Sequence, residues 1–145
     1  MLYIGADHQG LKLKEGLKNY LAKLGVAVID CGAFTYDKND DYVDFAFAVA
    51  KRMNTKKDFG LLVCGSGHGM VIAANKIKDV RAIMPLSVKS ARDGRSDDHA
   101  NVLVISAWEQ NEQLARGVIR EFLKTRPDKA KKYTRRLKKI SRLEK

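Results

Sequence analysis

The sequence predicts an α/β domain in which a parallel sheet of five strands lies between helices. Short apolar runs rich in Val, Ile and Leu alternate along the chain with longer amphipathic stretches, the pattern of repeated β-α units. The apolar runs are nearly continuous rather than alternating, as expected of strands covered on both faces. The expected strands are Leu2–Ala6, Val26–Cys31, Phe59–Cys64, Val80–Pro85 and Val102–Ser106.

Apolar residues at helical spacing identify the intervening segments as helices. The expected helices are Gly10–Leu24, Asp41–Met53, Gly69–Ile77 and Glu109–Lys124, followed by an extended basic C-terminal helix over about 128–145. The longest irregular stretch, Gly32–Asp40, follows the second strand and is therefore expected at the carboxyl edge of the sheet. Since the 145 residues contain no internal repeat or linker, we expect one domain over 1–145.

The formal net charge of +11 indicates anionic partners. Residues 128–145 alone hold nine Lys or Arg against two Asp or Glu. A solvated helix face, a nucleic-acid-binding tail, and cations presented to a phosphorylated substrate or a partner subunit all fit this segment. Nucleic acid is the least favoured partner, because the tail has no interleaved aromatics beyond Tyr133 and no nucleic-acid-binding module is recognisable.

The cellular location follows from what the apolar segments and cysteines allow. No apolar run approaches the roughly 18 residues of a membrane span, and Met1–Gly5 leads into a strand rather than a signal peptide. Two cysteines, Cys31 and Cys64, do not make a disulfide scaffold and fit a reducing compartment. We therefore expect a cytoplasmic protein without membrane contact.

The most informative segment, residues 61–70, runs Leu-Leu-Val-Cys-Gly-Ser-Gly-His-Gly-Met. Glycines at a strand-to-helix turn let the backbone approach a ligand closely, and the free N–H groups of the helix start favour an anion. The turn is not a P-loop, because no Gly-Lys-Ser/Thr follows, and the third glycine of a dinucleotide fingerprint would fall at Met70. The alternative is a tight turn that binds nothing.

Cys64 ends the strand beside this helix start. Both features lower the pKa of a thiol and predict a thiolate at neutral pH. A buried apolar cysteine is the alternative, and it is the interpretation that we adopt for Cys31.

The first strand ends in Asp7 and His8, which face the Cys64 turn if strands one and three are neighbours. There His8 would bind a phosphate and Asp7 would transfer protons, although Asp7 also fits a helix N-cap. The three histidines lie beside strand ends or loops, but their spacing matches no standard zinc set. We therefore expect no metal.

Motifs spread over nearly the whole chain resemble those of one enzyme family. They are Gly5-Ala6-Asp7-His8, Cys64-Gly65-Ser66-Gly67-x-Gly69, Ile72–Lys76 and Val80–Ala82, supported by Ser90–Arg92, Asn101–Leu103 and Arg135–Ile140. This set resembles the type B ribose-5-phosphate isomerase and galactose-6-phosphate isomerase family. The resemblance implies a Rossmann-like three-layer α/β/α domain, a homodimer or dimer of dimers with sites between subunits, and no cofactor or metal. It also implies aldose–ketose isomerisation of a sugar phosphate, above all ribose 5-phosphate, through a cis-enediolate.

The resemblance also implies a role for each matching residue. Cys64 would move the proton from C2 to C1, and Ser66 would shuttle protons between the oxygens. Asp7 would assist ring opening. The remaining implied positions are Gly65, Gly67, Gly69 and Asp98 in the anion hole, Tyr42 at the sugar, and His8 and Arg136 at the phosphate.

Several positions depart from the family pattern. The usual His-Asn-Asp reads Asp97-Asp98-His99, which leaves either Asp97 or His99 to open the sugar ring. Two expected arginines are replaced by Trp108 and Lys132, and His68 stands in place of a small aliphatic residue. Trp108 and His68 would reshape the pocket for another pentose or hexose phosphate. A catalytically inactive subunit of a hetero-oligomer is the other alternative.

Overall fold

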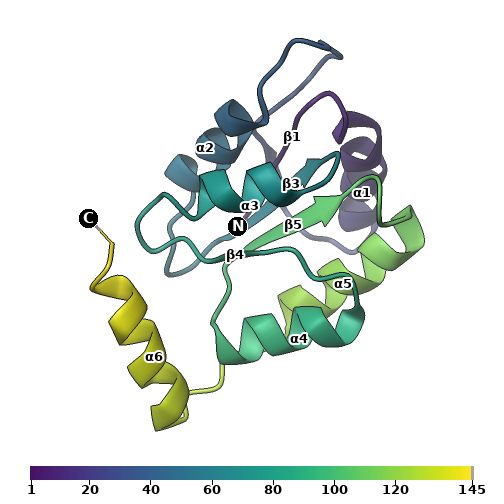
Figure 1. Cartoon of the computed structure of the whole chain (residues 1–145). Coiled ribbons are helices and arrows are strands. Elements are labelled where there is room, and N and C mark those ends of the chain that lie inside the picture. The colour runs from purple at the N-terminus through teal and green to yellow at the C-terminus, as the bar shows by residue number, and fades with distance from the viewer. Residues whose placement is uncertain (145) are drawn as a thin grey trace.

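The computed structural model describes residues 1–144, and its centre is a parallel sheet of five strands (Figure 1). The spatial order is β2-β1-β3-β5-β4, so strands one and three are neighbours, as the site prediction required. The buried Val, Leu and Ile runs form the three central strands. The strands are β1 (Leu2–Ala6), β2 (Val28–Asp30), β3 (Phe59–Cys64), β4 (Ala82–Ile83) and β5 (Val102–Ser106).

Helices cover both faces of the sheet, which confirms the predicted fold class. On one face, Leu17, Ile119 and Phe122 belong to the core under α1, α4 and α5. On the other face, Val49 and Met70 belong to the core under α2 and α3. The helices are α1 (Leu11–Lys23), α2 (Tyr42–Arg52), α3 (His68–Ala74), α4 (Val88–Asp97), α5 (Glu112–Lys124) and α6 (Lys131–Ser141).

The predicted elements differ from the structure at both outer strands and at two helices. The outer strands β2 and β4 are shorter than predicted, because each pairs on one side only. Helix α4 was missed because Ala91 is its one buried residue, although Ser87 caps it by accepting a 3.0 Å hydrogen bond from the Ser90 N–H. The basic helix starts at Lys131 rather than near 128, and Lys145, its predicted end, lies outside the described residues.

Helix α6 stands apart from the sheet (Figure 1), and none of its side chains is buried. The segment just before α6 contacts the end of α4, where the Asp128 N–H donates a hydrogen bond to the Ser96 carbonyl at 2.9 Å. Across residues 1–144, no helix combines the length and the apolar character needed to cross a membrane.

Candidate active site

The carboxyl ends of β1 and β3 form the floor of the candidate site. Ala6 pairs with Val63, so Asp7 and Cys64 follow at the same edge of the sheet. A Cβ added at Gly10 would lie 2.2 Å from the Val63 carbonyl oxygen and 2.9 Å from the Cys64 nitrogen. Only glycine allows this approach, and it closes the Asp7–Gly10 turn onto the end of β3. This arrangement confirms that the two sequence segments face one another.

The Cys64 thiol is buried, and the Gly67 N–H donates to its sulfur at 3.2 Å. Burial, followed by the negative charge of Asp7, raises the pKa of the thiol above its ordinary value. Hydrogen bonds from the Gly67 and Met70 N–H groups act in the opposite direction and are outweighed. The predicted lowering of this pKa was therefore wrong. The helix start lies beside Cys64 as expected. The sequence did not reveal how completely the thiol is shielded from water, or that the charge of Asp7 raises its pKa.

The Gly65–Gly69 loop is held by the end of β5. The Ser106 hydroxyl donates to the Gly65 carbonyl at 2.7 Å, and the Ala107 N–H donates to the Cys64 carbonyl at 2.8 Å. Buried Gln110 in turn accepts from the Ser106 N–H at 2.9 Å. Gly67 takes a left-handed φ of 86°. Sequence analysis missed Ser106 and Gln110, although a serine that ends a wholly apolar strand was a visible signal.

Two aromatic side chains lie against this loop. A Cβ added at Gly65 would lie 2.7 Å from the Trp108 ring, and one added at Gly69 would lie 2.4 Å from Cζ of Tyr42. Both rings keep solvent-exposed surface, Trp108 at 66%. Ser66 is half-buried in the same loop, and His68 is exposed as the first residue of α3. The structure thus brings Trp108 and Tyr42 to the Cys64 loop, as predicted.

Asp7 is buried at the end of β1, and its Oδ1 accepts from the Gly10 N–H at 3.0 Å. This bond stabilises the turn into α1, but the N-cap of that helix is Gly10, so the alternative interpretation of Asp7 as an N-cap was wrong. Burial raises the pKa of Asp7 despite that bond. A carboxyl group with a raised pKa beside a thiol is suited to proton transfer.

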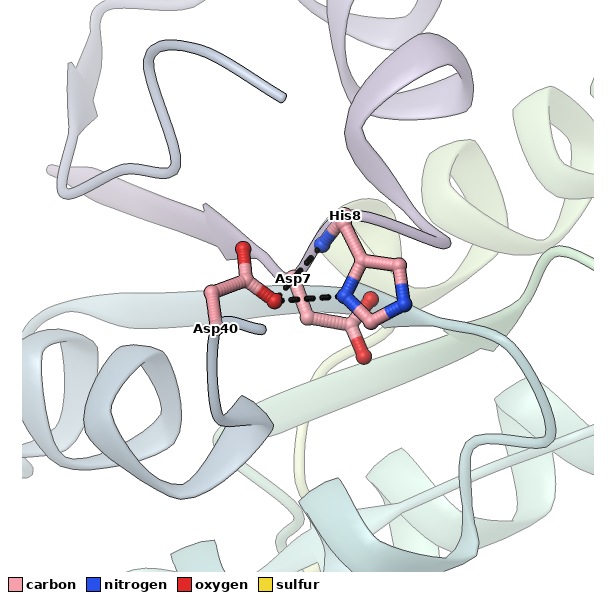
Figure 2. A group of neighbouring side chains, drawn as sticks. All are labelled: Asp7, His8 and Asp40. Carbon is pink, nitrogen blue, oxygen red and sulfur yellow. Dashed lines mark hydrogen bonds and ion pairs between the residues drawn. The ribbon is translucent and has the colours of Figure 1, made fainter. Parts of the chain in front are cut away.

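His8 is bound by Asp40, a residue that sequence analysis missed (Figure 2). The His8 Nδ1 lies 2.6 Å from Asp40 Oδ1, and this hydrogen bond is the main cause that raises the pKa of His8. Among residues 1–144, the ligand atoms of Asp7, His8 and Asp40 lie within 4.8 Å of one another and could hold a cation. Because His8 and Asp40 already bond to each other, the expectation of no metal stays a prediction.

Five predicted site residues lie elsewhere on the same subunit. Asp97 and Asp98 end α4 and line a surface pocket beside Met84. His99 lies at the amino end of β5, where its Nε2 is 2.7 Å from the Asp128 carbonyl oxygen. Lys132 and Arg136 are exposed on α6, where their cationic groups lie 4.6 and 6.0 Å from the centre of the Tyr133 ring. Within the described residues, no hydrogen bond or ion pair joins these five to Asp7, His8 or Cys64.

Comparisons with known proteins agree with this geometry. A model of the Ribose/Galactose Isomerase family matches residues 2–140. A probable ribose-5-phosphate isomerase B of Mycoplasma genitalium is 40% identical over 146 residues, which cover 99% of this chain and 95% of that protein.

Solved structures of similar proteins share the whole fold. Ribose-5-phosphate isomerase B from M. genitalium with bound ribulose-5-phosphate has a TM-score of 0.93 at 39% identity, covering 98% of this chain and 94% of that one. The ribose 5-phosphate isomerase of Thermotoga maritima has a TM-score of 0.92 at 37% identity and 97% coverage of both chains. With the family model matched from residue 2 to residue 140, this chain belongs to the Ribose/Galactose Isomerase family.

Proposed function

We propose that this protein is an aldose–ketose isomerase that interconverts ribose 5-phosphate and ribulose 5-phosphate. The observation that carries the proposal is the buried Cys64 thiol, with Asp7 beside it and backbone N–H groups directed at its sulfur. The relatives named ribose-5-phosphate isomerase B, one of them with bound ribulose-5-phosphate, support the choice of substrate.

The proposed chemistry moves one carbon-bound proton and one hydroxyl proton, and it needs no cofactor. As a thiolate, Cys64 takes the proton from C2 of the open aldose. The electron pair of that C–H bond forms the C1–C2 double bond of the enediolate, and the π pair of the C1 carbonyl moves to O1. The same proton then returns to C1 while O2 becomes the ketone oxygen. Backbone N–H groups of Gly65–Gly69 stabilise the negative charge on the sugar oxygens, Ser66 relays the hydroxyl proton, and Asp7 assists ring opening.

The simplest test replaces the base. Cys64→Ala should lower conversion of ribose 5-phosphate, followed by NMR, by at least about 10²-fold, because the proton acceptor is gone. Cys31→Ala removes the other thiol, at the end of β2, and should keep full turnover.

Unchanged turnover in Cys64→Ala would reject Cys64 as the base. If the unmodified protein does not convert ribose 5-phosphate, it should be assayed with a panel of other aldose phosphates. Turnover of one of them would indicate a changed substrate, and no turnover would indicate an inactive subunit.

The protonation state of Cys64 gives a second prediction. Its pKa is raised, so the thiolate, and with it kcat/KM, should increase as pH rises through neutrality. Thiolate absorbance of Cys31→Ala, after subtraction of the Cys31→Ala/Cys64→Ala double variant, should show a midpoint above the ordinary cysteine value of 9.0. A titration midpoint below pH 7 would contradict the raised pKa and support the neutral-pH thiolate predicted from the sequence.

We also propose that two copies of the chain form the working unit, with α6 of one copy completing the site of the other. A substrate phosphate carries a charge of about −2 and calls for cations besides His8. Helix α6 offers Lys132 and Arg136 together with apolar Ile140, which is 45% exposed. Leu143, just beyond the helix, is 82% exposed, so this arm has an apolar surface for a second copy to cover.

Mixing two inactive variants tests this arrangement. Cys64→Ala and Arg136→Ala, refolded together, should recover about one quarter of the unmodified rate, since half of randomly formed dimers are mixed and each mixed dimer has one intact site. The separate variants, refolded alone, are the controls. No recovery in a mixture shown by cross-linking to contain mixed dimers would place both residues in one subunit's site.

A second candidate function is isomerisation of another pentose or hexose phosphate, and the Trp108 ring against Gly65 favours it. Trp108 is the sole tryptophan of the sequence, so intrinsic fluorescence reports on this position alone.

Titration of Cys64→Ala with sugar phosphates should give a saturable fluorescence change with ribose 5-phosphate, because the indole borders the site. Trp108→Phe in the same background should lose the signal. Binding of a hexose phosphate at least about tenfold tighter, a difference of about 1.4 kcal/mol, would favour the second candidate.

A further inference from the structure

Asp40 holds His8 through two hydrogen bonds made by one carboxylate oxygen. Its Oδ1 accepts from the His8 main-chain N–H at 3.1 Å and bonds Nδ1 of the ring at 2.6 Å. The two bonds fix both the backbone at the end of β1 and the rotation of the imidazole. Both side chains are largely shielded from solvent, with 12% exposed for Asp40 and 17% for His8.

This pairing decides which ring nitrogen can meet a ligand. Because a carboxylate only accepts, Nδ1 must carry the hydrogen, and Nε2 points away from Asp40 (Figure 2). In a neutral ring with hydrogen on Nδ1, Nε2 is an acceptor and repels a phosphate oxygen. Only the imidazolium donates from both nitrogens, so a phosphate at Nε2 requires His8 to be charged.

The surroundings of His8 favour the charged ring. The hydrogen bond to Asp40 has the largest effect on the pKa of His8 and raises it. Burial has the next largest effect and lowers the pKa, and the charges of Asp40, Asp7 and Asp37 raise it further. Tyr36 contacts the ring edge-on, with centroids 5.8 Å apart. The second oxygen of Asp40, Oδ2, is buried without a hydrogen-bond partner among the described residues. A buried polar atom without a partner calls for an explanation. The role of Asp40 in holding His8 supplies one.

We propose that Asp40 is a positioning residue that locks the His8 ring and keeps it protonated, so that Nε2–H faces the phosphate of the substrate. The inference rests on the proposed function, in which His8 binds that phosphate. Asp40 itself need not touch the substrate.

The test compares Asp40→Asn with Asp37→Asn, which removes a nearby charge without removing a bond to His8. In Asp40→Asn, KM for ribose 5-phosphate should match the unmodified protein near pH 6 and exceed it about tenfold at pH 8, with kcat little changed. Asp37→Asn should stay within about twofold throughout. An equal rise in KM at both pH values would reduce Asp40 to a structural role and overturn the proposal.

NMR of labelled histidine gives a readout that does not depend on turnover. The His8 signals, assigned by their loss in His8→Gln, should titrate at lower pH in Asp40→Asn, and inorganic phosphate should shift them less at pH 8. If the protein lacks isomerase activity, the proposed function fails while this measurement still judges Asp40. An unchanged His8 midpoint overturns the inference.

A double-mutant cycle distinguishes an effect of Asp40 through His8 from a general folding defect. Adding Asp40→Asn to His8→Gln should leave KM unchanged, because the residue through which Asp40 acts is already gone. A further rise of the same size in that background would contradict the proposal.

Discussion

The site depends on the close approach of two backbone segments, the Asp7–Gly10 turn and the end of β3. Parallel pairing of Ala6 with Val63 sets the register, and the absence of a side chain at Gly10 lets the turn close onto Val63. The approach removes water from an acid and a thiol together. Burial raises the pKa of Asp7, and burial together with the negative charge of Asp7 raises the pKa of Cys64. The close approach of the two segments therefore sets the protonation of both groups.

A second constraint acts on the loop that carries Asp40. Lys14 is fully buried on α1, and its Nζ donates to Asp30 at 2.8 Å and to the Ala33 carbonyl at 2.6 Å. Although burial of Asp30 opposes ionisation, hydrogen bonds from Lys14 and Lys18 hold the pKa of that carboxyl below its ordinary value. This buried ion pair ties the start of the loop to α1. The other end of the loop then reaches back to His8 through Asp40.

The sequence predicted what periodicity and local motifs encode. Five apolar runs specified the sheet, and the glycine turn after Cys64 and the Asp7–His8 pair were found because each follows a strand. Asp40 could not be found in this way, because its partner lies 32 residues away and an acidic loop gives no periodic signal. The pKa of Cys64 could not be predicted either, since its desolvation depends on packing by segments that are distant in sequence, such as β1. In our proposal, Arg136 contributes to the site of the other subunit. The structure of one chain therefore does not place it beside Cys64.

The charge distribution explains why such a division between subunits is physically reasonable. The surroundings of His8 in the candidate site are rich in carboxylates, since Asp7, Asp37 and Asp40 all act on it. A dianionic substrate would be repelled by these groups if they acted alone. The positive charge of the chain is instead concentrated on α6, which packs little of its surface on its own subunit. In the dimer that we propose, α6 carries these cations to the acidic surroundings of His8 in its partner. Phosphate binding and assembly would then depend on the same helix, and the substrate would meet a complete site only where two chains join.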